Sequence, residues 1–329
     1  MAIKPSQLSL VCLLLKARKA TQRGFTLIEL LVALVVGSLI LGSLLYLVVE
    51  LMQVNRREEV LGQTQQDMQR AIDYITRDAR EAVFVYSTPG AIVDGTATLL
   101  EQLDGIPTDA VPILAFWRLD PVEAENDFWD IEDCEDEFTN QDKRNECNTL
   151  KLRQSYYTLV VYLQQANAEE DLWGGPSRII RYELPKYSTN DIAALTQRTG
   201  YSDPTGCGGF ANWTRPDSDC APDNVGTTEP NIAVLTDYVN FDGSAEDSVT
   251  CPAGYIQEPP NPSGFHVCIS NTAANSDNRT IRVFLQGNAT AGRPGLITAN
   301  SEAGRLPTLE SEILVRGVLD RQPPGTTDD

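Results

Sequence analysis

The chain has few of the side chains that build catalytic and metal centres. Its 329 residues contain one histidine, His266, and its seven cysteines include no CxxC pair. A structural zinc site needs several closely spaced cysteine or histidine ligands, so the sequence argues against one, and we expect no metal site and no cofactor. A Ser-His-Asp relay would have to use His266, which we interpret instead as a strand residue beside a disulfide-bonded Cys268.

Acidic residues are absent from the first 24 positions, although the chain as a whole is acidic. The formal net charge is −20 at pH 7, which argues against nucleic-acid binding because such proteins need a basic face. Positive charge near a membrane segment favours the cytoplasmic side, so we expect this N-terminal segment to stay inside and the rest to be exported. Its basic residues are Lys4, Lys16, Arg18, Lys19 and Arg23.

A long stretch lacks both charge and proline. No charged residue lies between Glu29 and Glu50, and no proline lies between Phe25 and Val85. About 20 helical residues at about 1.5 Å each match a hydrocarbon core of about 30 Å, so the stretch predicts a membrane-spanning helix. A secretory signal peptide would be cleaved after its apolar run, whereas the small residue Gly24 comes before this one.

Residues 23–29, RGFTLIE, resemble the processing site of type IV prepilins and type II secretion pseudopilins. The resemblance implies that a prepilin peptidase cuts after Gly24 and methylates the new N-terminus at Phe25. It also implies a structural subunit rather than an enzyme, with other pilins and an inner-membrane assembly platform as partners. The mature protein would be a single-pass inner-membrane protein with a periplasmic or extracellular head, and part of a cell-surface filament after assembly.

Glu29 would be the fifth residue of the processed protein. A charge at the centre of a membrane helix costs about 2.5–3.5 kcal/mol, so such residues are usually paired and functional. The resemblance implies that Glu29 pairs with the Phe25 amine of a neighbouring subunit and sets the register of assembly. The alternative is a carboxylate near the interface that reaches the lipid headgroups.

The helical pattern continues beyond the apolar stretch. Apolar or small residues recur in steps of three and four and form one stripe, which predicts that a sheet packs on this part of the helix. The stripe comprises Leu61, Thr64, Met68, Ile72, Ile75, Ala79 and Ala82. We therefore divide the chain into a cleaved leader, 1–24, a membrane or filament-core half of the helix, 25–52, an amphipathic half, 53–86, and a β-rich head, 87–329.

The head is rich in short segments of β-branched and aromatic residues. One long helix followed by such strands predicts an α+β, pilin-like fold with an antiparallel sheet and long loops. The expected strands are Val111–Leu119, Tyr156–Leu163, Arg178–Leu184, Ile232–Phe241, Thr280–Leu285 and Glu312–Val318.

The cysteines predict an oxidising compartment. Cys12 lies in the leader, which leaves an even set of six in the exported part, and disulfides between them would staple the long loops. Sequence alone does not choose among the pairings. Proximity favours Cys134–Cys147, Cys207–Cys220 and Cys251–Cys268.

Three features of the head invite a chemical interpretation. Residues 120–146 hold 12 acidic side chains, which we interpret as a solvated loop rather than the paired carboxylates of a glycoside hydrolase. Segments 217–219 and 242–247 offer oxygen ligands for calcium, yet neither fits the EF-hand loop. The tryptophans Trp117, Trp129, Trp173 and Trp213 suit either a core or stacking on sugar rings.

Segments 71–86, 111–118 and 178–184 resemble the larger minor pilins and J-type pseudopilins, and most of all the pseudopilins of hormogonium polysaccharide secretion. That resemblance implies a role in polysaccharide secretion and surface motility, with the exported polysaccharide as a further partner. The rival hypothesis is a membrane-anchored module that binds glycans or surfaces, an adhesin or lectin. Both hypotheses place the head outside the cell.

Overall fold

The computed structural model divides the chain into two compact units, residues 1–56 and residues 57–329. The structure describes residues 25–90, 92–93, 97–168, 172–188, 191–206, 209–227, 230–241, 250–271, 278–289 and 304–316.

The helix α2 runs from Leu27 to Arg80, as the absence of proline allows. It ends before the expected bound at residue 86, because the segment Ala82–Val85 forms the strand β1 instead. Its sequence, AVFV, is β-branched and aromatic, which favours a strand over another helical turn.

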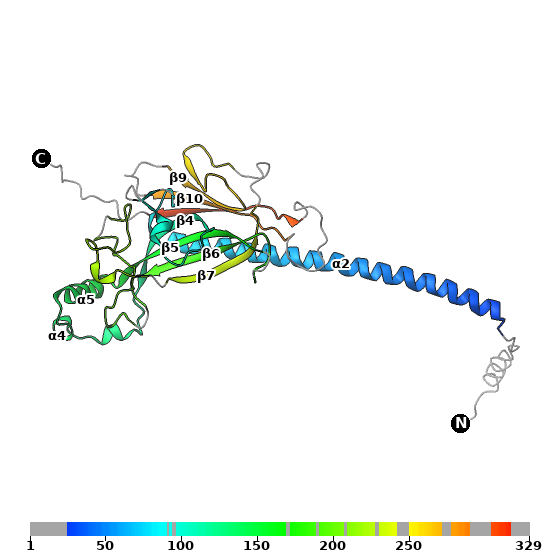
Figure 1. The fold of residues 1–329 in the computed structure, drawn as a ribbon, viewed down its shortest axis with the longest axis horizontal. Coiled ribbons are helices and arrows are strands. Elements are labelled where there is room, and N and C mark those ends of the chain that lie inside the picture. The colour runs from blue at the N-terminus through cyan, green and yellow to red at the C-terminus, as the bar shows by residue number, and fades with distance from the viewer. Residues whose placement is uncertain are drawn as a thin grey trace, which may run out of the picture. The chain divides into compact units, whose positions relative to one another are not determined.

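The larger sheet has five antiparallel strands in the order β1-β4-β5-β6-β7 (Figure 1). All four of the strands expected here are present; three are slightly longer than predicted, and the fourth, β7, ends at Val239 rather than at Phe241. They are β4 (Val111–Pro121), β5 (Ser155–Ala166), β6 (Ser177–Pro185) and β7 (Asn231–Val239).

A second antiparallel sheet has the order β11-β10-β9-β8. Its strand β10 (Asn278–Leu285) covers the predicted strand Thr280–Leu285, and β11 (Leu309–Arg316) overlaps the predicted strand Glu312–Val318, whose last two residues lie outside the described residues. The other two, β8 (Tyr255–Glu258) and β9 (Phe265–Ser270), were not among the predicted strands, although His266 of β9 was interpreted as a strand residue. A small hairpin, β2 (Ile92–Val93) with β3 (Ala97–Thr98), precedes the short helix α3 (Leu99–Gln102).

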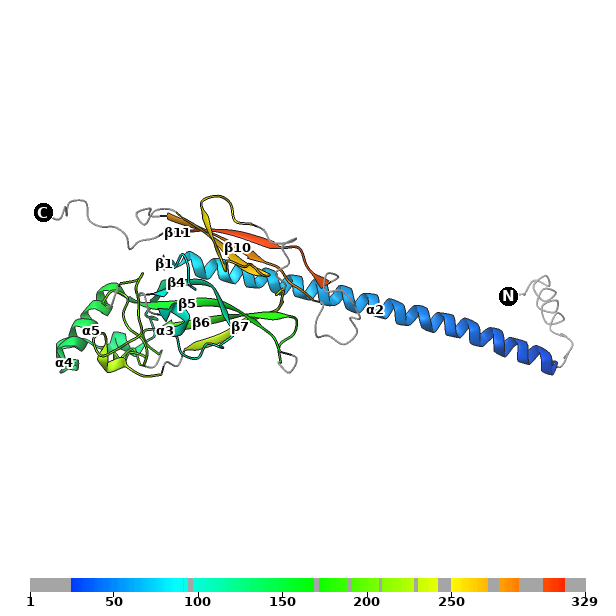
Figure 2. The ribbon, with the colours of Figure 1, turned by 45° about the horizontal axis from the view of Figure 1, so that its top comes forward.

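The second half of α2 lies between the two sheets (Figure 2). Its buried residues Met68, Ile72 and Ile75 belong to the predicted stripe and share one core with both sheets. Side chains alternate along β5, so Val160 faces this core while Val161 faces a second core on the other side of the sheet. The α+β fold with a long helix packed on antiparallel sheets is therefore confirmed.

The acidic segment is folded, which corrects the expectation of a solvated loop. It contains a 3-10 turn, η1 (Asp127–Asp130), and two helices, α4 (Cys134–Glu137) and α5 (Gln141–Arg153). Asp133 and Asn140 cap the two helices, because each side chain accepts a hydrogen bond from a first-turn backbone N–H. One acidic side chain of the segment, Asp133, therefore starts a helix instead of being only solvated.

This insert, residues 122–154, forms a small core together with Tyr187, Ile192 and Leu195, which follow β6. It leaves β4 and enters β5 at adjacent positions, because Pro121 pairs with Ser155 and the Val122 N–H donates to Gln154 O at 3.0 Å. The buried Lys186 Nζ lies 2.6 Å from a carboxylate oxygen of Glu146 and so ties the insert to the end of β6.

Two of the three predicted disulfides are confirmed. Cys134–Cys147 joins α4 to α5 with a Cα–Cα distance of 5.9 Å, and Cys251–Cys268 joins the segment before β8 to β9 at 5.6 Å. The third prediction, Cys207–Cys220, stays a prediction because Cys207 lies outside the described residues.

Candidate functional site

The described chain begins at Phe25, and Gly24 lies outside the described residues. Phe25 is 81% exposed, and α2 starts two residues later. Thr26 begins the helix because its backbone oxygen accepts hydrogen bonds from Glu29 N at 3.1 Å and Leu30 N at 3.2 Å. Glu29 therefore lies in the first turn, where a carboxylate is favourable beside the positive end of the helix dipole.

The described part of the first unit, residues 25–56, exposes nearly all of its apolar side chains. Within the described residues α2 is long and apolar enough to cross a membrane, and none of its most apolar window is buried. The two serines in this stretch satisfy their hydroxyls locally, since Ser38 Oγ donates to Val35 O at 2.8 Å and Ser43 Oγ donates to Ile40 O at 2.9 Å. This surface suits an apolar environment supplied by lipid or by other helices.

A buried charge cluster joins the second half of α2 to the five-stranded sheet. Asp78, 5% exposed, accepts hydrogen bonds from Tyr162 Oη at 2.6 Å and Arg181 Nε at 2.8 Å, and it also pairs with Arg118. Glu183 pairs with both arginines, at 2.7 Å to Arg118 and 2.8 Å to Arg181. The cluster fixes the helix to three neighbouring strands, β4, β5 and β6.

The environment of Asp78 holds its pKa below the ordinary value of 3.8. Burial alone would raise the pKa, but the hydrogen bond and charge of Arg181, the hydrogen bond from Tyr162 and the charge of Arg118 together lower it. The carboxylate therefore stabilises the fold above pH 3.8, and this contribution is lost as the pH falls through the lower pKa of the folded state.

We expect the pH dependence of stability to reveal this shift. The free energy of unfolding of the wild type should exceed that of an Asp78→Asn variant by a constant amount near neutral pH, and the difference should shrink below pH 3.8. Denaturant titrations of both proteins between about pH 7 and pH 3 measure it. A difference that stays constant over the whole range would contradict the assigned shift.

A known protein family matches the region that includes the start of α2. The family described as the prokaryotic N-terminal methylation motif matches residues 19–45. The chain carries a prepilin-type N-terminus. No curated protein and no solved structure matches the chain.

This prepilin-type motif supports the class of type IV pilins and pseudopilins, whose members are structural subunits. The match covers Phe25 and Glu29, the residues that the sequence singled out, together with the most exposed part of the helix. The helix and the motif are also consistent with membrane anchoring, processing by a prepilin peptidase and assembly with other pilins.

The four tryptophans of the head lie in different environments. Trp117 and Trp213 are fully buried, with ring centroids 5.6 Å apart, and they fill the core on the far side of the sheet from α2. Trp129 Nε1 donates to Glu123 O at 2.9 Å within the insert. Trp173 alone among them is exposed, at 43%.

The remaining candidates take structural positions. His266 lies buried on β9, where its ring stacks on Phe284 with centroids 4.8 Å apart. The carboxylate of Asp217 accepts hydrogen bonds from the backbone of Asp219 and Cys220, both at 2.8 Å, and so closes a turn. The other calcium candidate, 242–247, lies outside the described residues. No group of three or more potential metal ligands occurs in the part of the chain that the structure describes.

The sequence analysis missed the Asp78 cluster. Two signals for it were present: an acid beside the apolar stripe of the helix, and an arginine inside each of two strongly apolar strand segments, VPILAFWRL and RIIRYEL. Buried charges are usually paired, so these three residues could have been predicted to meet.

Proposed function

We propose that the protein is a large minor subunit of a type IV pilus-like or type II secretion-like filament. The observation that carries this proposal is the prepilin-type motif at the start of a helix whose apolar side chains are left exposed. Before assembly, a helix of this kind can reside in the lipid bilayer. It can then pack among equivalent helices of other subunits without changing its own fold.

In this proposal the leader is cut after Gly24 on the cytoplasmic face and the Phe25 amine is methylated. The five basic residues of the leader support a cytoplasmic N-terminus and an exported head. The two confirmed disulfides support an oxidising compartment for the head.

During assembly Glu29 pairs with the Phe25 amine of a neighbouring subunit. Support comes from the exposure of Phe25 and from the position of Glu29 in the first helical turn, within reach of an incoming helix end. A desolvated ion pair of this type gives specificity of register, because misaligned helices would leave both charges unpaired in an apolar environment.

Mass spectrometry of the mature membrane protein tests the processing step. We expect the N-terminal peptide to begin at Phe25 and to carry one methyl group. The matched control is the same protein expressed without a prepilin peptidase, in which the N-terminal peptide should begin at Met1. Mature protein from the native cell that still begins at Met1 would overturn the proposal.

We further propose that the filament supports polysaccharide secretion and surface motility. This finer assignment is supported by the resemblance of residues 71–86, 111–118 and 178–184 to the corresponding pseudopilins. A second candidate, a membrane-anchored module that binds glycans or surfaces, is favoured by one observation, the exposed ring of Trp173. An unprocessed N-terminus would favour that candidate over the filament subunit.

A further inference from the structure

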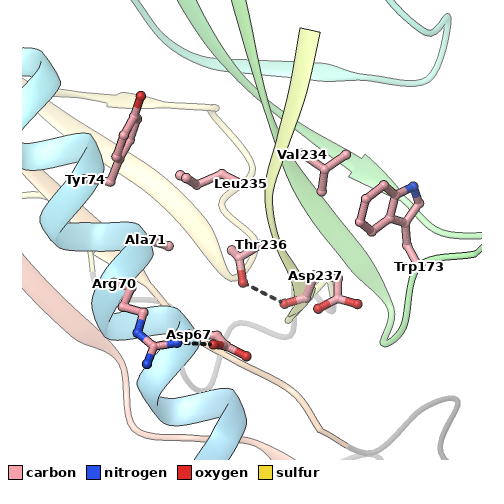
Figure 3. A pocket seen from close by; sticks show the side chains of 9 residues that line it. All are labelled: Asp67, Arg70, Ala71, Tyr74, Trp173, Val234, Leu235, Thr236 and Asp237. Atoms are coloured by element: carbon pink, nitrogen blue, oxygen red, sulfur yellow. Dashed lines mark hydrogen bonds and ion pairs between the residues drawn. The ribbon is translucent and has the colours of Figure 1, made fainter.

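A groove lies between α2 and the outer edge of the five-stranded sheet. It has a volume of about 420 Å³, which is within the range of small-ligand sites. Residues Val234 to Asp237 of β7 line one side of it, and the described pairing on the outer side of β7 is the bridge between Val239 and Gly287, beyond the groove. Figure 3 shows the lining residues Asp67, Arg70, Ala71, Tyr74, Trp173 and Val234 to Asp237.

Two aromatic rings line this groove and are only half covered. Trp173 is 43% exposed and Tyr74 is 44% exposed, whereas Trp117, Trp213 and Tyr162 are fully buried. Neither Trp173 nor Tyr74 belongs to any of the hydrophobic clusters of the head. Their apolar surfaces therefore add little to the fold and are available to a ligand.

The backbone beside Trp173 is fixed in place. The Gly174 N–H donates to a carboxylate oxygen of Asp237 at 2.8 Å, and the Gly174 carbonyl accepts hydrogen bonds from Tyr238 N at 3.1 Å and from Asn167 Nδ2 at 2.8 Å. A Cβ atom at Gly174 would lie 2.1 Å from the hydroxyl of Tyr238, so glycine allows this close approach. Because this backbone is already fixed before a ligand binds, stacking of a ligand on the Trp173 ring costs less conformational entropy.

Tyr74 is held in a similar way. The guanidinium carbon of Arg181 lies 5.7 Å from the centre of the Tyr74 ring, and Arg181 is itself anchored by Asp78. Around the two rings the groove carries the carboxylates of Asp67 and Asp237, the guanidinium of Arg70 and the hydroxyl of Thr236. The Asp67–Arg70 pair, at 3.3 Å, is exposed and can exchange partners at low cost.

This set of groups matches an uncharged sugar. The C–H faces of a pyranose ring pack on aromatic rings, while its hydroxyls donate to carboxylates and accept from a guanidinium. Acidic sugars fit poorly, because the groove presents two carboxylates on a chain of net charge −20. An open groove also admits an internal stretch of a longer chain, which a closed pocket would exclude.

We propose that this groove binds a neutral oligosaccharide, with Trp173 and Tyr74 as stacking platforms. The inference deepens the glycan-binding candidate named above and does not rest on entry into a filament, since the groove lies wholly within residues 57–329.

The test is a binding measurement on the full-length protein in a detergent without a sugar headgroup. An array of neutral gluco-, galacto-, manno- and xylo-oligosaccharides, with oligogalacturonates as the acidic comparison, identifies ligands, and calorimetry on the hits gives affinities. We expect binding to at least one neutral series and none to the oligogalacturonates. Absence of binding to every neutral series, or equal binding of the oligogalacturonates, would overturn the proposal.

Variants locate the site. Trp173→Ala and Tyr74→Ala should each weaken binding by about tenfold or more, whereas Trp173→Phe, which keeps a ring, should lose less. The matched control is Leu172→Ala, since Leu172 is fully exposed on the same loop and does not line the groove. Wild-type affinity in Trp173→Ala would place any binding elsewhere and refute the groove. A negative result leaves the processing of the N-terminus unaffected, so the two proposals fail separately.

Discussion

Replacement of Asp78 by alanine is expected to lower the free energy of unfolding by about 3 kcal/mol, because Arg118 and Arg181 lose the most buried of their carboxylate partners. Glu183, which pairs with both arginines, and Asp120, which pairs with Arg118, remain and limit the loss. The side chain of Asp78 is 4% exposed and that of Arg181 is 10% exposed, so water cannot replace the missing partner. Guanidinium chloride titration of the purified protein in detergent measures the loss, with the fluorescence of the buried Trp117 and Trp213 as the signal.

Asp73→Ala is the matched control, because Asp73 is an exposed acid on the same helix. Its effect should stay within about 0.5 kcal/mol. Asp78→Asn keeps the shape and one acceptor oxygen and should fall between the two. Equal stabilities of the Asp73 and Asp78 alanine variants would show that the cluster does not anchor the helix.

Replacement of Glu29 by alanine is expected to leave leader removal largely intact and to block entry into the filament. If Glu29 pairs with the Phe25 amine of a neighbour, breaking that pair in an apolar environment costs about 3–5 kcal/mol, which corresponds to a reduction of about 100-fold or more in the assembly equilibrium. Immunoblots of sheared surface filaments and of membranes, compared between wild type and variant, measure the partition.

Glu50→Ala serves as the matched control, since Glu50 is the other carboxylate that bounds the apolar stretch and it is also exposed. This variant should assemble normally. Wild-type amounts of Glu29→Ala protein in the filament fraction would refute the pairing, even where its N-terminus is correctly processed.

Local sequence patterns predicted most of the regular structure. The helix followed from an unbroken periodicity without proline, and each expected strand was found because its β-branched and aromatic residues lie in a sheet with at least one buried face. The helix bound was wrong at its end because the stripe residue Ala82 also fits a strand, and pairing with β4 favours the strand.

The parts that the sequence did not predict depend on contacts between distant segments. Only His266 of β9 was interpreted as a strand residue, because the histidine and cysteine in FHVCIS interrupt the apolar pattern of a strand that is fully buried between β8 and β10. The helix α5 has almost no apolar face, and its packing depends on the Cys134–Cys147 disulfide and on Leu150. The helices α4 and α5 were therefore not predicted, because the high density of acidic residues indicated a solvated loop.

The N-terminal motif and the groove also differ in whether their residues are contiguous in the sequence. The prepilin-type motif is contiguous, so sequence alone could place Phe25 and Glu29 at the start of the helix. The groove joins residues from α2, from β7 and from the loop before β6, and only the folded chain brings them together. Trp173 was one of four equivalent tryptophans in the sequence, and its exposure distinguishes it.

The insert between β4 and β5 begins and ends at paired positions of one hairpin, Pro121 and Ser155. Its apolar side chains gather in a cluster separate from the two cores of the sheet. The lobe can therefore change in length at that junction without altering the pairing of β4 with β5, provided that Tyr187, Ile192 and Leu195, which share its apolar cluster, keep a partner.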